Sequence, residues 1–169
     1  MKTIDNYFKL LRLDHWFKNT FMFSGVVWSV WLTGDNLNPY LIILAFVLAS
    51  SISSVNYIIN QIADIQFDIL HPTKRYRVLP SGIVSVKSAS FVACVLVTMA
   101  LLIGILFYES LFVWTLIAFL IAGLIYNLKP IRLKDVPFID VLSESINNPI
   151  RFMIGWTAVT IGNLPPTSL

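Results

Sequence analysis

Long apolar runs separated by short polar segments dominate the chain, and five of them are long enough to predict membrane spans. Their ranges are 19–33, 40–59, 88–107, 111–126 and 138–161. Before the first run, residues 2–18 place apolar side chains on one helical face, at Ile4, Tyr7, Phe8 and Leu11. We expect this stretch to form an amphipathic helix at the membrane interface. The pattern therefore predicts an all-α, polytopic transmembrane helix bundle of about five spans.

Composition agrees with a protein embedded in the lipid bilayer. Hydrophobic residues occupy 57% of the 169 positions and charged residues only 12%, and the mean hydropathy is +0.77. Soluble domains carry about a quarter charged residues, so a soluble domain is excluded. The single cysteine, Cys94, lies in an apolar run and cannot form a disulfide within one chain. No basic pattern indicates nucleic-acid binding, and residues 1–18 lack the apolar core of a signal peptide.

The positions of the basic residues predict the topology. If the five spans alternate in direction, every Lys and Arg except Arg151 lies on the same side as the N-terminus. The turns on the opposite side carry Asp35 and Glu109 and no basic residue. By the positive-inside rule, the N-terminus and the loops at 60–88 and 127–137 face the cytoplasm. We expect an integral protein of the bacterial inner membrane.

Three polar side chains are aligned at the end of the second span. Asn60, Asp64 and Asp68 follow one another at intervals of four residues. Each is offset from the last by about 40° on a helix, so all three share one face. Mg²⁺ binds one or two carboxylates and completes its coordination with phosphate oxygens. We therefore expect these three residues to be metal ligands and catalytic residues, on a helix that stops before Pro72.

Basic side chains follow these acids closely, at Lys74, Arg75 and Arg77. Cationic groups of this kind bind phosphate, so the stretch predicts a diphosphate site in which these three residues contact the substrate. His71 lies where it can cap the loop, and the chain's two histidines are too scattered for a metal site. The alternative is an ordinary solvated helix end just beyond the membrane surface.

The acidic stretch resembles the first aspartate-rich motif of the UbiA superfamily of intramembrane prenyltransferases, N-(D/Q)-x-x-D-x-x-x-D. Here the motif is Asn60, Gln61, Asp64 and Asp68. The segment at 77–82 is similar to the R-P-L-x-S-G element of that superfamily, with valine at the first proline position. The resemblance implies a helical membrane enzyme that uses Mg²⁺ to bind a diphosphate.

Three further segments extend the resemblance over most of the chain. Tyr126 and the basic loop containing Lys129, Arg132 and Lys134 resemble the loop after the fourth helix of the superfamily. The resemblance implies that Tyr126 and Lys129 contact the substrate. Residues 15–19 and 71–75 are similar to a branch that includes the decaprenyl-phosphate phosphoribosyltransferases. The implied partners are a polyprenyl diphosphate or a polyprenyl phosphate, and the lipid bilayer.

The chain departs from the superfamily in one respect. Members have about nine transmembrane helices and a second aspartate-rich motif between the sixth and the seventh. This sequence has about five predicted spans and no second D-x-x-x-D. We expect residues 1–169 to form a single transmembrane domain, the N-terminal portion of a longer protein, with 60–88 as its motif loop. The alternative is that the second acidic motif comes from elsewhere.

The fifth run carries polar residues at membrane depth, with one helical face formed by Asp140, Glu144, Asn147 and Arg151. Such groups are costly in lipid and usually face a bundle interior or a wet cavity. We expect Glu144, Asn147 and Arg151 to contact the substrate and Pro149 to kink the helix. The alternative is a structural ion pair of Glu144 with Arg151 or with a lysine.

Lys18 lies beside Asn19 where the chain first enters the membrane. One interpretation is a second phosphate contact that faces the acidic motif. The other is an ordinary lysine whose ammonium group extends to the membrane surface. Trp16 is interpreted as an interface anchor.

The leading functional hypothesis is an Mg²⁺-dependent transferase that moves a polyisoprenyl group from its diphosphate to an acceptor, with an aromatic acceptor as one candidate. The alternative is transfer of a 5-phosphoribosyl group from phosphoribosyl diphosphate to a polyprenyl phosphate. In both reactions the leaving group is a metal-bound diphosphate. A hypothesis of another class is a non-catalytic membrane protein or an inactive fragment.

Overall fold

The computed structural model describes residues 2–166, excepting the side chains of Lys2, Thr3 and Glu144. Every element in this range is helical, which confirms the predicted all-α class. The α-helices are α1 (Lys2–Leu11), α2 (Met22–Thr33), α3 (Pro39–Leu70), α4 (Val86–Phe107), α5 (Ser110–Asn127), α6 (Ile139–Ser145) and α7 (Asn147–Thr157). Three 3-10 helices join them: η1 (Leu13–Phe21), η2 (Lys74–Tyr76) and η3 (Leu133–Asp135).

Helix α3 is the longest element and carries the acidic motif. Its N-terminus is capped by Asn38, whose side-chain oxygen accepts from the backbone N–H groups of Tyr40 and Leu41. Its 32 residues span about 48 Å at 1.5 Å per residue, well beyond the ~30 Å of a bilayer core. The helix runs through Asp68 and ends at Leu70, before Pro72, as predicted.

Three helices among the described residues are long and apolar enough to cross a membrane, namely α3, α4 and α5. The first and fifth predicted spans are instead built from shorter pieces. The first is divided between η1 and α2, and the fifth between α6 and α7, with a turn at Ile146. Pro149 cannot donate to the preceding turn, which explains why the break occurs just before it. Similarly, the predicted helix at 2–18 ends at Leu11, because Arg12 adopts left-handed backbone angles (φ 50°).

Helices α2 and α7 cross with their backbones in contact. A Cβ atom added to Gly25 would lie 2.0 Å from the carbonyl oxygen of Phe152, and one added to Gly155 would lie 1.8 Å from that of Met22. Only glycine fits at either position without movement of the partner helix. Small residues allow this close approach between membrane helices.

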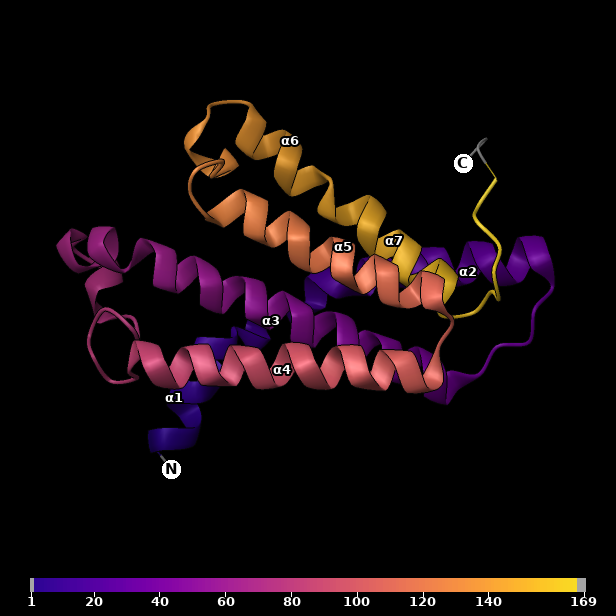
Figure 1. The fold of residues 1–169 in the computed structure, drawn as a ribbon, viewed down its shortest axis with the longest axis horizontal. Helices are drawn as coiled ribbons and strands as arrows, with labels where there is room; N and C mark the ends of the chain where they lie inside the picture. Colours follow the sequence, from indigo (N-terminus) through magenta and orange to yellow (C-terminus); the bar gives the residue numbers. More distant parts are fainter. Residues whose placement is uncertain (1, 167–169) are drawn as a thin grey trace.

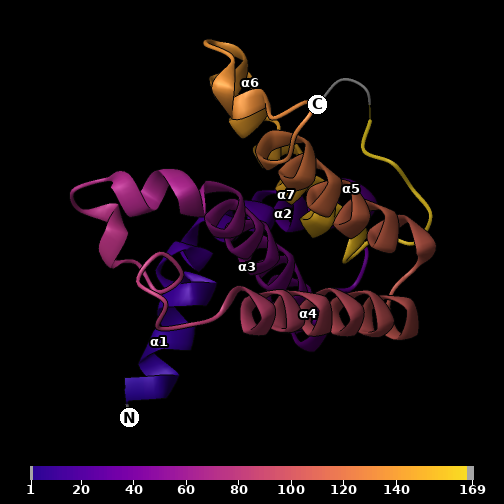
Figure 2. The ribbon, with the colours of Figure 1, turned by 60° about the vertical axis from the view of Figure 1, so that its left-hand side comes forward.

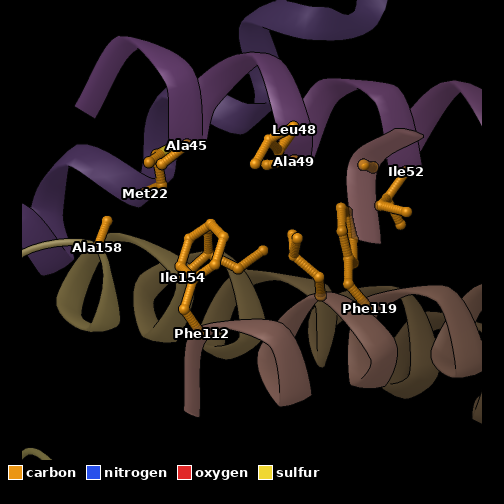
Figure 3. Packing of buried hydrophobic residues seen from close by; sticks show 11 residues of the cluster. Met22, Ala45, Leu48, Ala49, Ile52, Phe112, Phe119, Ile154 and Ala158 are labelled. Atoms are coloured by element: carbon orange, nitrogen blue, oxygen red, sulfur yellow. The ribbon is translucent and has the colours of Figure 1, made fainter. Parts of the chain in front are cut away.

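The main core forms where α2, α3, α5 and α7 meet. Figure 3 shows its side chains pointing toward one another from these helices: alanines and Leu48 from α3, Phe112 and Phe119 from α5, and Ile154 from α7. In Figure 1, α3 runs beside α4, and α5 runs beside α7, and the turned view of Figure 2 agrees. The polar residues described below lie between these helix pairs and at one end of α3.

A second core fastens the N-terminal helix and the motif loop to α3. Leu10 is fully buried and packs with Val55 and Ile58 of α3 and with Val78 and Leu79 of the loop. Ile4 and Phe8, which were predicted to share the apolar face of the first helix, are exposed at 63% and 52%. The face of α1 that packs on α3 is therefore centred on Leu10 and does not include Ile4 or Phe8.

Candidate functional site

A row of polar side chains along α3 lines one wall of a cavity. Ser53, Asn56, Tyr57 and Asn60 of α3 contribute to its wall, and its volume is about 710 Å³. The rest of the lining comes from Arg12, η1, α5, α6 and α7. Its polar members are Arg12, His15, Lys18, Thr20, Tyr126, Asn127, Ser145, Asn147, Asn148 and Arg151. A cavity of this size, with convergent polar groups, has the features of a small-molecule site.

Asp64 lies one helical turn beyond Asn60 and is held by two basic side chains from the loop after α5. Lys134 donates from Nζ to both carboxylate oxygens, at 2.7 Å each, and Arg132 donates from Nη2 to Oδ1 at 2.9 Å. The Lys134 ammonium also lies 3.5 Å from the side-chain oxygen of Asn127, a residue of the cavity wall. The ion cluster therefore adjoins the cavity.

Asp68 has its own cationic partner. Arg77 donates from Nη1 to Oδ2 at 2.7 Å, and the Asp68 side chain is only 5% exposed. This contact folds the motif loop back onto the helix that precedes it, and Val78 and Leu79 are buried immediately afterwards. Asp68 thus has a structural role in closing the loop, besides the metal-binding role expected from the sequence.

The loop that carries Arg132 has a special backbone conformation. Arg132 has φ 36°, in the left-handed region that non-glycine residues rarely occupy. Its guanidinium lies over the Phe67 ring, 5.4 Å from the centroid, and its Nε lies 2.7 Å from Asp135 Oδ2. Unfavourable backbone angles of this kind persist where surrounding contacts hold them and are frequent at functional sites.

Another part of the cavity wall is organised around Arg151 of α7. This residue is 7% exposed. Its Nε donates to Asn19 Oδ1 at 3.0 Å, and its Nη1 donates to Asn148 Oδ1 at 3.1 Å. Its guanidinium also lies 5.3 Å from the centre of the Phe119 ring. The amides of two distant segments thereby fix the direction of a buried cation.

Asn56 reaches the cavity wall because α5 has a glycine opposite it. A Cβ added to Gly123 would lie 2.1 Å from Asn56 Cγ. Asn56 donates from Nδ2 to the Phe119 carbonyl at 3.0 Å, while its Oδ1 has no hydrogen-bond partner among the described residues. The side chain thus joins α3 to α5 beside the cavity.

The N-terminal part of the chain is tied to the same face of α3. Trp16 donates to Ser54 Oγ at 2.9 Å, and Asn19 donates to Ser50 Oγ at 3.0 Å. Gln61, the second residue of the motif, is buried and donates to the Leu10 carbonyl at 3.0 Å. These contacts hold η1 in place so that it lines the cavity. Trp16 is therefore a packing contact with α3, in addition to its predicted role as an interface anchor.

The structure brings some of the predicted site residues together and leaves others apart. Those that line the cavity are Lys18, Asn60, Tyr126, Asn147 and Arg151. Lys74 and Arg75 are exposed, and Arg75 donates to the Tyr76 hydroxyl. Lys129 is also exposed, and the basic contacts to Asp64 come from Arg132 and Lys134. The Glu144 side chain lies outside the described part of the chain, so the predicted pair with Arg151 stays a prediction.

The prediction for His71 is confirmed in detail. Its Nδ1 accepts from the backbone N–H groups of Thr73 at 3.2 Å and Lys74 at 3.3 Å, and it thereby caps the turn after α3. Sequence reasoning did not identify Asn56 as a cavity residue. Asn56 precedes Asn60 by four positions, so extension of the motif's spacing toward the N-terminus was the signal that could have found it.

The donor set near Asp64 fits Mg²⁺ better than a softer metal. No three His, Cys, Asp or Glu side chains converge as a metal site within residues 2–166. Asn60, Asp64 and Asp68 offer only oxygen donors on one helix face, and this set is incomplete without further ligands. Mg²⁺ usually binds in this way, through one or two carboxylates together with water and substrate phosphate.

Comparisons with known proteins now identify the chain's relatives. The model of the UbiA prenyltransferase family matches residues 22–169. The 4-hydroxybenzoate octaprenyltransferase of Providencia stuartii is 24% identical over 152 residues, which cover 89% of this chain and 49% of that protein. The decaprenyl-phosphate phosphoribosyltransferase of Corynebacterium glutamicum is 26% identical over 161 residues, which cover 93% of this chain and 47% of that protein.

A solved structure shares the fold. A UbiA homolog from Archaeoglobus fulgidus bound to GPP and Mg²⁺ superposes with a TM-score of 0.78 at 22% identity, over 96% of this chain and 56% of that one. The chain thus spans about half the length of the relatives described here. Because the family match extends over nearly the whole sequence, the chain belongs to the UbiA prenyltransferase family.

Proposed function

We propose that this chain binds the diphosphate of a donor substrate between the acidic motif of α3 and the basic loop after α5, in an Mg²⁺-dependent transferase of the membrane. The observation that supports this most directly is the contact of Arg132 and Lys134 with Asp64, next to the cavity. Oxygen ligands for Mg²⁺ and cations for phosphate are thus gathered at one place. We further propose that this end of α3 faces the cytoplasm, as the positive-inside rule predicts.

In this proposal each group has a distinct task. Asn60, Asp64 and Asp68 would hold Mg²⁺, and a bound Mg²⁺ would supply positive charge to stabilise the departing diphosphate. Arg132 and Lys134 would donate hydrogen bonds to the diphosphate, and Arg77 keeps Asp68 in position. The carbon–oxygen bond of the donor breaks with its electron pair going to the diphosphate, and the acceptor forms the new bond to that carbon. The surrounding helices exclude water from the reacting carbon.

The leading candidate for the donor is a polyprenyl diphosphate. The octaprenyltransferase relative and the GPP-bound homolog support this reading by similarity. Exposed apolar side chains on α4 and α5, such as Phe91, Leu102 and Trp114, are compatible with contact to an isoprenoid tail.

A second candidate is transfer of a 5-phosphoribosyl group, and the composition of the cavity favours it. Amides, hydroxyls and basic groups predominate in the wall, and its purely apolar side chains are Phe17, Phe21, Phe119 and Val141. Such a wall offers hydrogen bonds to a hydroxylated, phosphorylated sugar more readily than to a hydrocarbon. The similarity to the phosphoribosyltransferase of Corynebacterium glutamicum points the same way.

A transfer assay distinguishes these candidates. Membranes that carry the protein are incubated with labelled polyprenyl diphosphates or with labelled phosphoribosyl diphosphate, each with and without Mg²⁺. We expect a lipid-soluble product that depends on Mg²⁺. Product from phosphoribosyl diphosphate and none from any prenyl diphosphate would reject the leading candidate. A complete lack of product with all donors, together with no binding of diphosphate, would favour a non-catalytic membrane protein.

A further inference from the structure

The charges around the acidic motif are already balanced. Asp64, Asp68 and Asp135 are paired with Arg77, Arg132 and Lys134, at distances of 2.7–2.9 Å. The single ammonium group of Lys134 contacts both carboxylate oxygens of Asp64. The carboxylate offered as a metal ligand is therefore occupied by a cation in this arrangement.

A divalent cation that arrives alone meets two obstacles. It must replace the Lys134 ammonium at Asp64, and it must then lie close to two displaced positive groups. Only 12% of the Lys134 side chain and 10% of the Arg132 side chain are exposed, so water screens this repulsion incompletely. Binding of the metal by itself should therefore be weak.

A diphosphate removes both obstacles. Its oxygens accept hydrogen bonds from ammonium and guanidinium groups as a carboxylate does, and guanidinium matches phosphate geometry particularly well. Lys134 can exchange Asp64 for phosphate through its flexible side chain and remain close to Asn127, the cavity residue beside it. Arg132 is held in addition by Phe67 and Asp135, so it stays where a phosphate arrives. The Asp64 oxygens would then be free to bind the metal.

We infer that Lys134 and Arg132 are specificity-determining residues, which make the site accept a divalent metal together with diphosphate and reject the metal alone. This inference rests on the proposed function of the acidic motif. Through these two loop residues, the metal and the diphosphate each strengthen the binding of the other by the same factor.

The test measures metal binding and does not require turnover. Mn²⁺, a paramagnetic probe for Mg²⁺ sites, is titrated into the purified full chain in detergent, first alone and then with inorganic diphosphate. For Lys134→Met we expect Mn²⁺ alone to bind about tenfold more tightly than to wild type, the equivalent of one charge-assisted hydrogen bond. The strengthening of Mn²⁺ binding by diphosphate should fall about tenfold as well. Lys134→Arg keeps the cation and should retain the wild-type preference.

Two further variants separate the possible outcomes. Lys87→Met removes an exposed lysine at the start of α4 and should change neither titration. Arg132→Gln repeats the test if Lys134→Met does not fold. Unchanged or weaker binding of Mn²⁺ alone, in a folded Lys134 or Arg132 variant, would overturn the inference. The proposed function fails separately if Asp64→Asn binds Mn²⁺ and diphosphate as tightly as wild type.

Discussion

Two polar regions beside the same cavity hold charged groups by different means. At the end of α3, carboxylates are held by long cationic side chains, whereas at α7 a guanidinium is held in part by the neutral amides of Asn19 and Asn148. An ion pair can exchange its carboxylate for a phosphate of the same charge sign. An amide fixes direction by geometry and offers no such exchange. We therefore expect the first region to rearrange when substrate binds, whereas the two amides hold Arg151 in one direction.

The largest effect is expected at the acidic motif of α3, where the ion pairs can be exchanged. Asp64→Asn keeps the shape of the side chain but removes the negative charge that, in the proposed site, would bind Mg²⁺. The initial rate of transfer at saturating Mg²⁺ should fall on the order of a thousandfold, because several kcal/mol of transition-state stabilisation depend on the metal. The substitution also removes the counter-charge of the buried Arg132 and Lys134 side chains, so the amount of folded protein in the membrane is measured alongside and the rate is normalised to it. A rate close to wild type would remove Asp64 from the metal site.

A change at Arg151 of α7 should mainly lower the stability of the protein. Arg151→Met keeps the aliphatic bulk but leaves the Asn19 Oδ1 atom, in a fully buried residue, without its donor. An unsatisfied buried acceptor costs about 1–3 kcal/mol, so the midpoint of thermal unfolding in detergent should fall clearly. Lys87→Met serves as a control for loss of one positive charge. An unchanged midpoint would mean that Arg151 is not a fixed part of the fold.

The smallest effect is expected for Asn148→Ala. Asn148 is exposed and makes one hydrogen bond to Arg151, so the loss should be about 1 kcal/mol. A double-mutant cycle with Arg151→Met checks whether the two residues act as a unit. The combined variant should unfold at nearly the same midpoint as Arg151→Met alone. Additive losses would show that Asn148 stabilises the protein by some other contact.

Sequence patterns predicted the helices with strong local signals and failed where distant segments decide the structure. The extent of α3 followed from its apolar run, its aligned polar face and Pro72. The division of the fifth run into α6 and α7 was only partly predictable, since Pro149 indicates a break but not how the two pieces pack. Likewise, the buried face of α1 depends on Leu10 contacts with α3 and the motif loop, which no local periodicity contains.

The alignment of the acidic residues could be predicted from the sequence, whereas their ion-pair partners could be predicted less well. Spacing alone placed Asn60, Asp64 and Asp68 on one face. The sequence assigned Lys74 and Arg75 to the diphosphate because they follow the acids closely, and that role stays a prediction. The ion-pair partners of Asp64 are Arg132 and Lys134, separated from it by 68 and 70 positions. Local proximity in the sequence is a poor guide to ion pairs that the packing of α3 against α5 and its loop brings together.

The crossing of Gly25 and Gly155 has a consequence for biogenesis. Helix α2 is made early, but the backbone it packs against belongs to α7, which leaves the ribosome much later. The hydrogen bond from Arg151 to Asn19 joins residues 132 positions apart, so this wall of the cavity forms only after the intervening helices are inserted. Contacts of such long range slow folding because the connecting chain must be ordered first. We expect α2 to depend on neighbouring lipid or insertion factors until α7 arrives, and the cavity to be among the last parts of the molecule to assemble.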